Sequence, residues 1–93
     1  MDKPIAHAQR EAKNKPFDLG PFIARLNALI EKHNESYREA GMNAGLDHQA
    51  IRRILSGQRP AMVDCILLAD HYGVNPNEFL ELAGWPTLKA FDV

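Results

Sequence analysis

Hydrophobic residues recur at helical spacing through most of the chain, and residues that typically begin or end helices separate one hydrophobic stretch from the next. Apolar side chains three and four positions apart indicate one buried face per helix, and no stretch shows the strict alternation of a half-buried strand. From Asp18 onward we expect five helices of about 8 to 14 residues. The predicted fold is all-α, a compact five-helix bundle.

Three of the predicted helices are bounded by clear start and stop residues. The first is expected at 21–33, with Pro21 in its first turn. The fourth is expected at 62–72 and stops at Gly73, while the fifth begins after an Asn75 cap and ends at Gly84. The inward faces predicted for the first and fourth helices are Phe22, Ile23, Leu26, Leu29 and Ile30, and Met62, Cys65, Ile66, Leu68 and Ala69.

The second helix is expected to begin after Ser36 and to end at a sharp turn. Ser36 and Glu39 form the pattern of a capping box, in which the hydroxyl and the carboxylate each bind a backbone N–H. Gly41 weakens this helix by about 1 kcal/mol relative to alanine. Gly45 is suited to the left-handed conformation that ends it.

The third helix is expected to begin at His48, after an Asp47 cap, and to end at Gly57. Leu46 and Ile51 occupy the positions of a hydrophobic staple. Helical periodicity divides its residues into two faces. We expect Ala50, Ile51, Ile54 and Leu55 to face inward, and His48, Gln49, Arg52, Arg53 and Ser56 to face elsewhere.

A helix-turn-helix motif needs two short helices, a turn that contains glycine, and outward residues at the start of the second helix. Residues 36–56 fit this pattern. The chain around them, over about residues 22–83, resembles the phage-repressor and Cro-like helix-turn-helix family (XRE type, Cro/C1 type). The matching residues are Ala40-Gly41, Gly45-Leu46, Ile51, Arg53-Ile54, Gly57, Pro60, Leu68-Ala69, Gly73-Val74 and Phe79-Leu80. The family usually has Leu-Ala at Ala40-Gly41 and often Gln at Tyr37, so we expect a second helix that is loosely packed or shifted.

The resemblance implies a lambda-repressor-like domain that binds double-stranded DNA as a homodimer and regulates transcription in a prokaryote or phage. By this match, the residues that contact bases are His48, Gln49 and Arg53. Those that contact the DNA backbone are Tyr37, Arg52, Gln58 and Arg59. Glutamine can pair with adenine and arginine with guanine. On charge alone a solvated surface explains Arg52 and Arg53 equally well, and His48 could instead support the Asp47 cap.

The net charge of −1 is unusual for a DNA-binding domain, but its distribution is uneven. Residues 1–16 and residues 36–60 each have a net charge of +2, whereas residues 61–93 have one lysine against five acidic residues. A basic middle and an acidic end favour one face for phosphate and another turned away from it. The expected organisation is a flexible basic leader at 1–16, the DNA-binding domain at 17–84 and an apolar tail at 85–93.

Several classes of function are disfavoured by composition. No apolar run approaches the roughly 18 residues of a membrane helix, so we expect a cytoplasmic protein with no membrane partner. Cys65 is the only cysteine, and His7, His33 and His71 lack the spacing of metal ligands, so no metal or other cofactor is expected. No catalytic residue set accompanies the acidic side chains, so we do not expect an enzyme.

A different function remains open from the sequence. The acidic C-terminal half and the tail that begins at Trp85 could belong to a protein-interaction module or an antitoxin-like adaptor. Trp85, Leu88 and Phe91 either fold back over the bundle or form an apolar patch that faces a protein partner.

Overall fold

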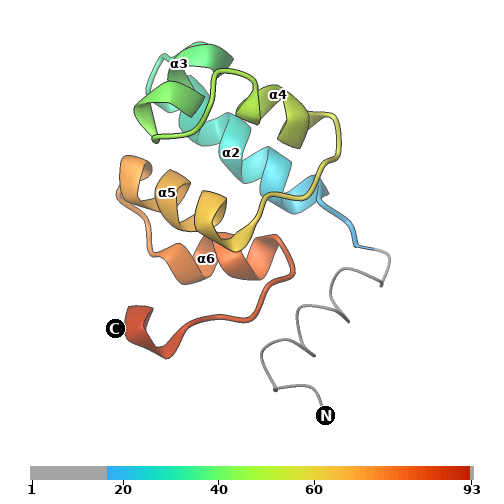
Figure 1. Cartoon of the computed structure of the whole chain (residues 1–93), viewed down its shortest axis with the longest axis vertical. Helices are drawn as coiled ribbons and strands as arrows, with labels where there is room; N and C mark the ends of the chain where they lie inside the picture. The colour runs from blue at the N-terminus through green and yellow to red at the C-terminus, as the bar shows by residue number, and fades with distance from the viewer. Residues whose placement is uncertain (1–16, 93) are drawn as a thin grey trace.

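Five α-helices and one short 3-10 turn make up the regular structure of the computed structural model, which describes residues 17–92 (Figure 1). No strand occurs in this part of the chain, so the predictions of an all-α fold and of five helices are confirmed. The predicted leader at 1–16 lies outside the described residues. The elements are α2 (Gly20–Lys32), α3 (Tyr37–Asn43), α4 (Ala50–Leu55), α5 (Met62–Tyr72), α6 (Pro76–Leu82) and η1 (Lys89–Phe91).

The predicted helix caps explain where several of these helices begin and end. The Ser36 hydroxyl accepts the Glu39 N–H at 3.1 Å, and the Glu39 carboxylate accepts the Ser36 N–H at 2.9 Å, which confirms the capping box of α3. The Asn75 side chain accepts the Asn77 N–H at the start of α6. Gly73 ends α5 in the left-handed conformation, as predicted.

One hydrophobic core joins the five helices. Its largest fully buried side chains include Phe22 of α2 and Phe79 of α6, whose ring centroids lie 5.1 Å apart. None of the residues described in the structure is a buried polar or charged residue, so the core is apolar throughout. Its other fully buried large members are Leu26, Ile51, Cys65, Leu68 and Leu80.

The turn between α3 and α4 is packed tightly around Gly41. Gly41 is buried, and a Cβ atom added to it would lie only 2.8 Å from the backbone oxygen of Asp47. Gly45 has a φ of 89°, a conformation in which glycine is favoured, as the sequence predicts. The expectation of loose packing at Gly41 is therefore wrong, because the absence of a side chain lets the two segments touch.

The C-terminal segment folds back onto the bundle. Trp85 is 8% exposed, lies in the core, and donates its indole N–H to the Pro60 carbonyl at 2.8 Å. The Asn77 side chain accepts the Leu88 N–H and donates to the Leu88 carbonyl. Trp85 therefore packs against the bundle and does not form an exposed apolar patch. Folded structure also continues beyond Gly84.

Candidate functional site

The outer face of α4 and of the turn before it is polar and exposed. The side chains predicted to contact bases, His48, Gln49 and Arg53, are all exposed, and so is Arg52. The opposite face is formed by Ala50, Ile51 and Ile54, which are buried as predicted. The predicted base-contacting residues are therefore all accessible, and Asp47 contacts both the Gln49 N–H and the Arg53 side chain.

The start of the third helix differs from the prediction. We expected the helix to begin at His48, but α4 begins at Ala50, and His48 and Gln49 lie in a turn before it. The Asp47 carboxylate accepts the Gln49 N–H at 2.8 Å, and the Asp47 carbonyl accepts the Ala50 N–H at 3.2 Å. This tight turn takes the place of the first helical turn, so α4 is shorter than expected.

Arg53 is paired with Asp47 on this surface. Its Nη2 atom lies 2.5 Å from Oδ2 of Asp47, and each side chain is about half exposed, at 46% and 55% respectively. The hydrogen bond from Arg53, together with that from the Gln49 N–H, lowers the pKa of Asp47. The same bond raises the pKa of Arg53, so both groups stay charged at neutral pH.

Tyr37 and Arg52 connect this surface to α3. The guanidinium carbon of Arg52 lies 5.8 Å from the centroid of the Tyr37 ring, within the range of a cation–π contact. Tyr37 is 39% exposed at the first position of α3. Two of the predicted DNA-backbone residues therefore lie side by side at the edge of the predicted base-contacting group.

Arg59 has internal partners that the sequence did not predict. Its Nε atom donates to the Ala83 carbonyl at 2.6 Å and its Nη2 atom to the Gly84 carbonyl at 2.7 Å. Its guanidinium carbon lies 4.0 Å from the Trp85 ring centroid and 5.2 Å from that of Phe17. Partial burial lowers the pKa of Arg59. These contacts make Arg59 a link between distant segments, and its predicted contact with the DNA backbone stays a prediction.

Gln58, the remaining predicted backbone-contacting residue, is exposed between α4 and Arg59. A small hollow of about 50 Å³ lies beside it, lined by Arg53, Gln58, Arg59 and Asp64 among others. A hollow of this size has room for water but not for a nucleotide. Any recognition by these side chains must therefore take place on the open surface.

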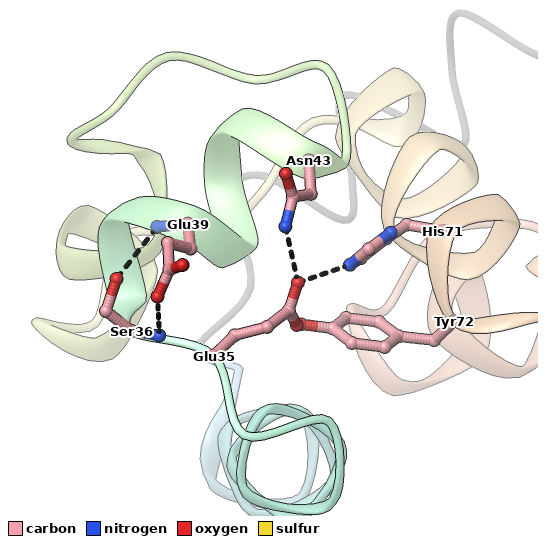
Figure 2. A network of polar contacts seen from close by, with 6 residues as sticks. All are labelled: Glu35, Ser36, Glu39, Asn43, His71 and Tyr72. Atoms are coloured by element: carbon pink, nitrogen blue, oxygen red, sulfur yellow. Dashed lines mark hydrogen bonds and ion pairs between the residues drawn. The ribbon is translucent and has the colours of Figure 1, made fainter.

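A partly buried carboxylate that the sequence analysis missed fixes the far end of α3 (Figure 2). The Glu35 side chain is 9% exposed and accepts hydrogen bonds from the Tyr72 hydroxyl at 2.8 Å and the Asn43 amide at 2.9 Å. Nε2 of His71 lies 2.7 Å from the same carboxylate, and the His33 ring lies 5.0 Å from the Tyr72 ring. Glu35 therefore ties the C-terminal ends of α3 and α5 together.

The hydrogen bonds decide the charge of Glu35. Burial raises its pKa, but the bonds from Asn43, Tyr72 and His71 outweigh burial, so its pKa is below the ordinary value of 4.5. A carboxylate with a lowered pKa stabilises the fold above its unfolded pKa, and this stabilisation is lost as pH falls through the folded pKa. The network should therefore weaken in acid.

Replacement of Glu35 by glutamine tests this network. We expect the free energy of unfolding at pH 7 to fall by about 1 to 3 kcal/mol, because the variant lacks the charge that the three donors share. The difference from the wild type should shrink as pH falls below about 4.5. Urea unfolding at a series of pH values measures both effects. Glu31→Gln, on the exposed surface of α2, is the control; equal effects of the two substitutions would contradict the assignment.

Three findings on residues 17–92 concern metal ligands, the cysteine thiol and membrane-spanning helices. Residues 17–92 contain no cluster of three or more histidine, cysteine, aspartate or glutamate side chains able to hold a metal ion. Burial raises the pKa of Cys65 to about 12, so its thiol is not ionised at neutral pH. None of the described helices is long and apolar enough to cross a bilayer.

Comparison of the chain with protein-family models, with curated proteins and with solved structures finds no match in any of the three. The resemblance to the Cro-like helix-turn-helix family therefore stays a prediction from the sequence.

Proposed function

We propose that the chain binds double-stranded DNA sequence-specifically as a helix-turn-helix protein, with α4 and the turn before it in the major groove. The observation that supports this most directly is the exposure of His48, Gln49 and Arg53, with Asp47 in contact with both the Gln49 N–H and Arg53, while Ala50 and Ile51 behind them are buried. The major groove is about 12 Å wide and admits one α-helix. A short helix with its opposite face buried against the bundle suits this geometry.

The side chains on this surface have the hydrogen-bonding groups that reading DNA requires. Arg53 can donate two bonds to guanine, Gln49 can pair with adenine, and His48 can donate or accept. Arg52, Tyr37 and Gln58 lie at the edges and would bind phosphate oxygens, which set the register. The first three side chains would thus contact bases, and the other three would contact the DNA backbone.

The regulatory role and the assembly are part of the same proposal. A homodimer would place two copies of α4 in successive major grooves, so the two half-sites should lie about one helical turn apart, or roughly 10 base pairs. Such a protein would regulate transcription by occupying its site. The spacing of half-sites in selected duplexes reports the dimer directly.

Selection from a pool of random duplexes, followed by titration of the full chain, tests the proposal. We expect a preferred sequence, and an affinity that falls by about 0.9 log units per tenfold rise in salt for each phosphate contact. The variant Arg53→Ala should lose preference at one base-pair position. Lys89→Ala removes the same charge from η1, at the opposite end of the molecule from α4 (Figure 1), and should leave the preference unchanged. Absence of any preference and of any salt dependence would refute DNA binding.

A second candidate function is supported by an apolar groove on the outer side of α5. The groove, of about 340 Å³, is lined by Ile66, Leu67, Ala69, Asp70, Gly73, Val74, Pro76 and Phe91. Its apolar lining and the acidic C-terminal half would suit a protein partner with an apolar, basic segment. A protein-interaction module of this kind would show no sequence preference in the duplex selection.

A further inference from the structure

Both oxygens of the Asp47 carboxylate are used on the proposed reading surface. Oδ1 accepts the Gln49 N–H at 2.8 Å, and Oδ2 lies 2.5 Å from Nη2 of Arg53. One side chain thus holds the turn that presents Gln49 and also holds the guanidinium of Arg53. The inference that follows rests on the proposed function and assigns Asp47 a role within it.

The ion pair restricts a side chain that is otherwise flexible. A free arginine side chain has about 2 kcal/mol of rotamer entropy, and an exposed one samples many positions. Arg53 is 46% exposed, so packing alone does not fix it. The bond to Asp47 selects the conformers in which the guanidinium lies beside the start of α4.

The pairing leaves Arg53 able to bind a base. A guanidinium has five N–H donors, and the bond to Asp47 uses one on Nη2. The remaining donors suffice for a two-bond contact with O6 and N7 of guanine. We infer that Asp47 is a specificity-determining positioning residue, which holds Arg53 ready for guanine and restrains it from binding phosphate.

The charge of Asp47 supports the second half of this role. A carboxylate on the reading surface repels phosphate groups and competes with them for the Arg53 guanidinium. Removal of the charge should therefore strengthen sequence-independent binding while weakening discrimination between bases. The first effect follows from charge alone. The loss of discrimination at the base pair that Arg53 contacts is the effect that a residue which only capped the turn would not produce.

The variant Asp47→Asn separates the two roles of this side chain. Asparagine still offers an oxygen to the Gln49 N–H, since asparagine and aspartate cap helices equally well, but it has no charge to pair with Arg53. Asp18 is the matched control, because its Oδ1 accepts the Gly20 N–H at the same distance of 2.8 Å and in the same two-residue turn. Asp18→Asn therefore repeats the chemical change away from Arg53.

The experiment titrates the full chain against its selected duplex, against a duplex changed at the base pair that Arg53→Ala identifies, and against random duplexes. For Asp47→Asn we expect about a tenfold loss of discrimination at that base pair and tighter binding to random duplexes. In the double variant with Arg53→Ala, Asp47→Asn should cause no further loss there. Asp18→Asn should match the wild type. The variant Asp47→Ser, which keeps a capping oxygen, replaces Asp47→Asn if urea unfolding shows that the latter is destabilised.

Full discrimination at that base pair in a folded Asp47→Asn would overturn the inference, and so would an equal loss at every position. The failure of the proposed function looks different. In that case the wild type itself shows no sequence preference, and Arg53→Ala identifies no base pair.

Discussion

Replacing Trp85 by alanine is expected to lower the free energy of unfolding by about 3 to 5 kcal/mol, the usual cost of truncating a large buried aromatic side chain. The ring is 8% exposed, and its N–H bonds to the Pro60 carbonyl. Loss of the ring also removes the surface on which the Arg59 guanidinium stacks. Small domains are stable by only about 5 to 15 kcal/mol, so this variant should be close to unfolding.

Two further variants serve as comparisons for Trp85→Ala, with the free energy of unfolding of each measured in urea. Trp85→Phe keeps an aromatic ring beside Arg59 but leaves the Pro60 carbonyl without its donor, and should cost less than alanine, at about 1 to 3 kcal/mol. Val63→Ala removes apolar atoms from a side chain that is 58% exposed and should change stability by no more than about 0.5 kcal/mol. If Trp85→Ala were as mild as Val63→Ala, the C-terminal segment would not belong to the core.

Gly41→Ala is expected to destabilise the protein by about 1 to 3 kcal/mol, although alanine is the better helix former by about 1 kcal/mol. The added Cβ would lie 2.8 Å from the Asp47 backbone oxygen, so α3 and the turn before α4 must move apart. Urea unfolding of this variant and of Met42→Ala measures the effect. Met42 is the next residue of the same helix and is 54% exposed, so its truncation should be nearly neutral.

The outcome for Gly41→Ala discriminates between two explanations of the glycine. Stabilisation by about 1 kcal/mol would mean that helix propensity decides, and that the contact with Asp47 relaxes at little cost. Destabilisation would mean that the chain needs glycine where the Cro-like family usually has alanine. The second result would also predict weaker DNA binding, because the same contact places the turn that presents Gln49.

Local signals in the sequence were sufficient to predict most of the secondary structure. The capping box at Ser36, the Asn75 cap and the left-handed Gly45 and Gly73 each depend on residues within a few positions of one another. The buried face of α4 and the exposure of Arg53 follow from helical periodicity, whereas His48 and Gln49 are exposed in a turn before the helix. What those residues bind remains a prediction.

The features that were missed depend on contacts between distant residues or on unusual turns. Glu35 bonds to His71 and Tyr72, which are 36 and 37 positions away, and no local pattern points to such a pair. Arg59 was expected to contact the DNA backbone. The sequence could not show that its guanidinium bonds to the Ala83 and Gly84 carbonyls and stacks on Trp85, because these residues are about 25 positions away.

The ion pair between Asp47 and Arg53 was not predicted from the sequence for a related reason. Side chains six positions apart do not meet on an ideal helix, where neighbours are three or four residues apart. They meet here because Asp47 precedes α4 in a tight turn, and the helix begins two residues later than the capping signal suggested. A prediction that extends the helix to His48 places the two side chains apart.

The contacts of Arg59 have a consequence for the way in which this domain opens. The ends of a domain usually fray before the rest, but Phe17 and Trp85, near the two ends of the described chain, both lie against one guanidinium that follows α4 closely. Release of Trp85 would break the stacking and disturb the anchor of the loop after α4 at the same time. Fluctuations of the C-terminal segment and of α4 should therefore belong to one cooperative unit, with a single free energy of opening.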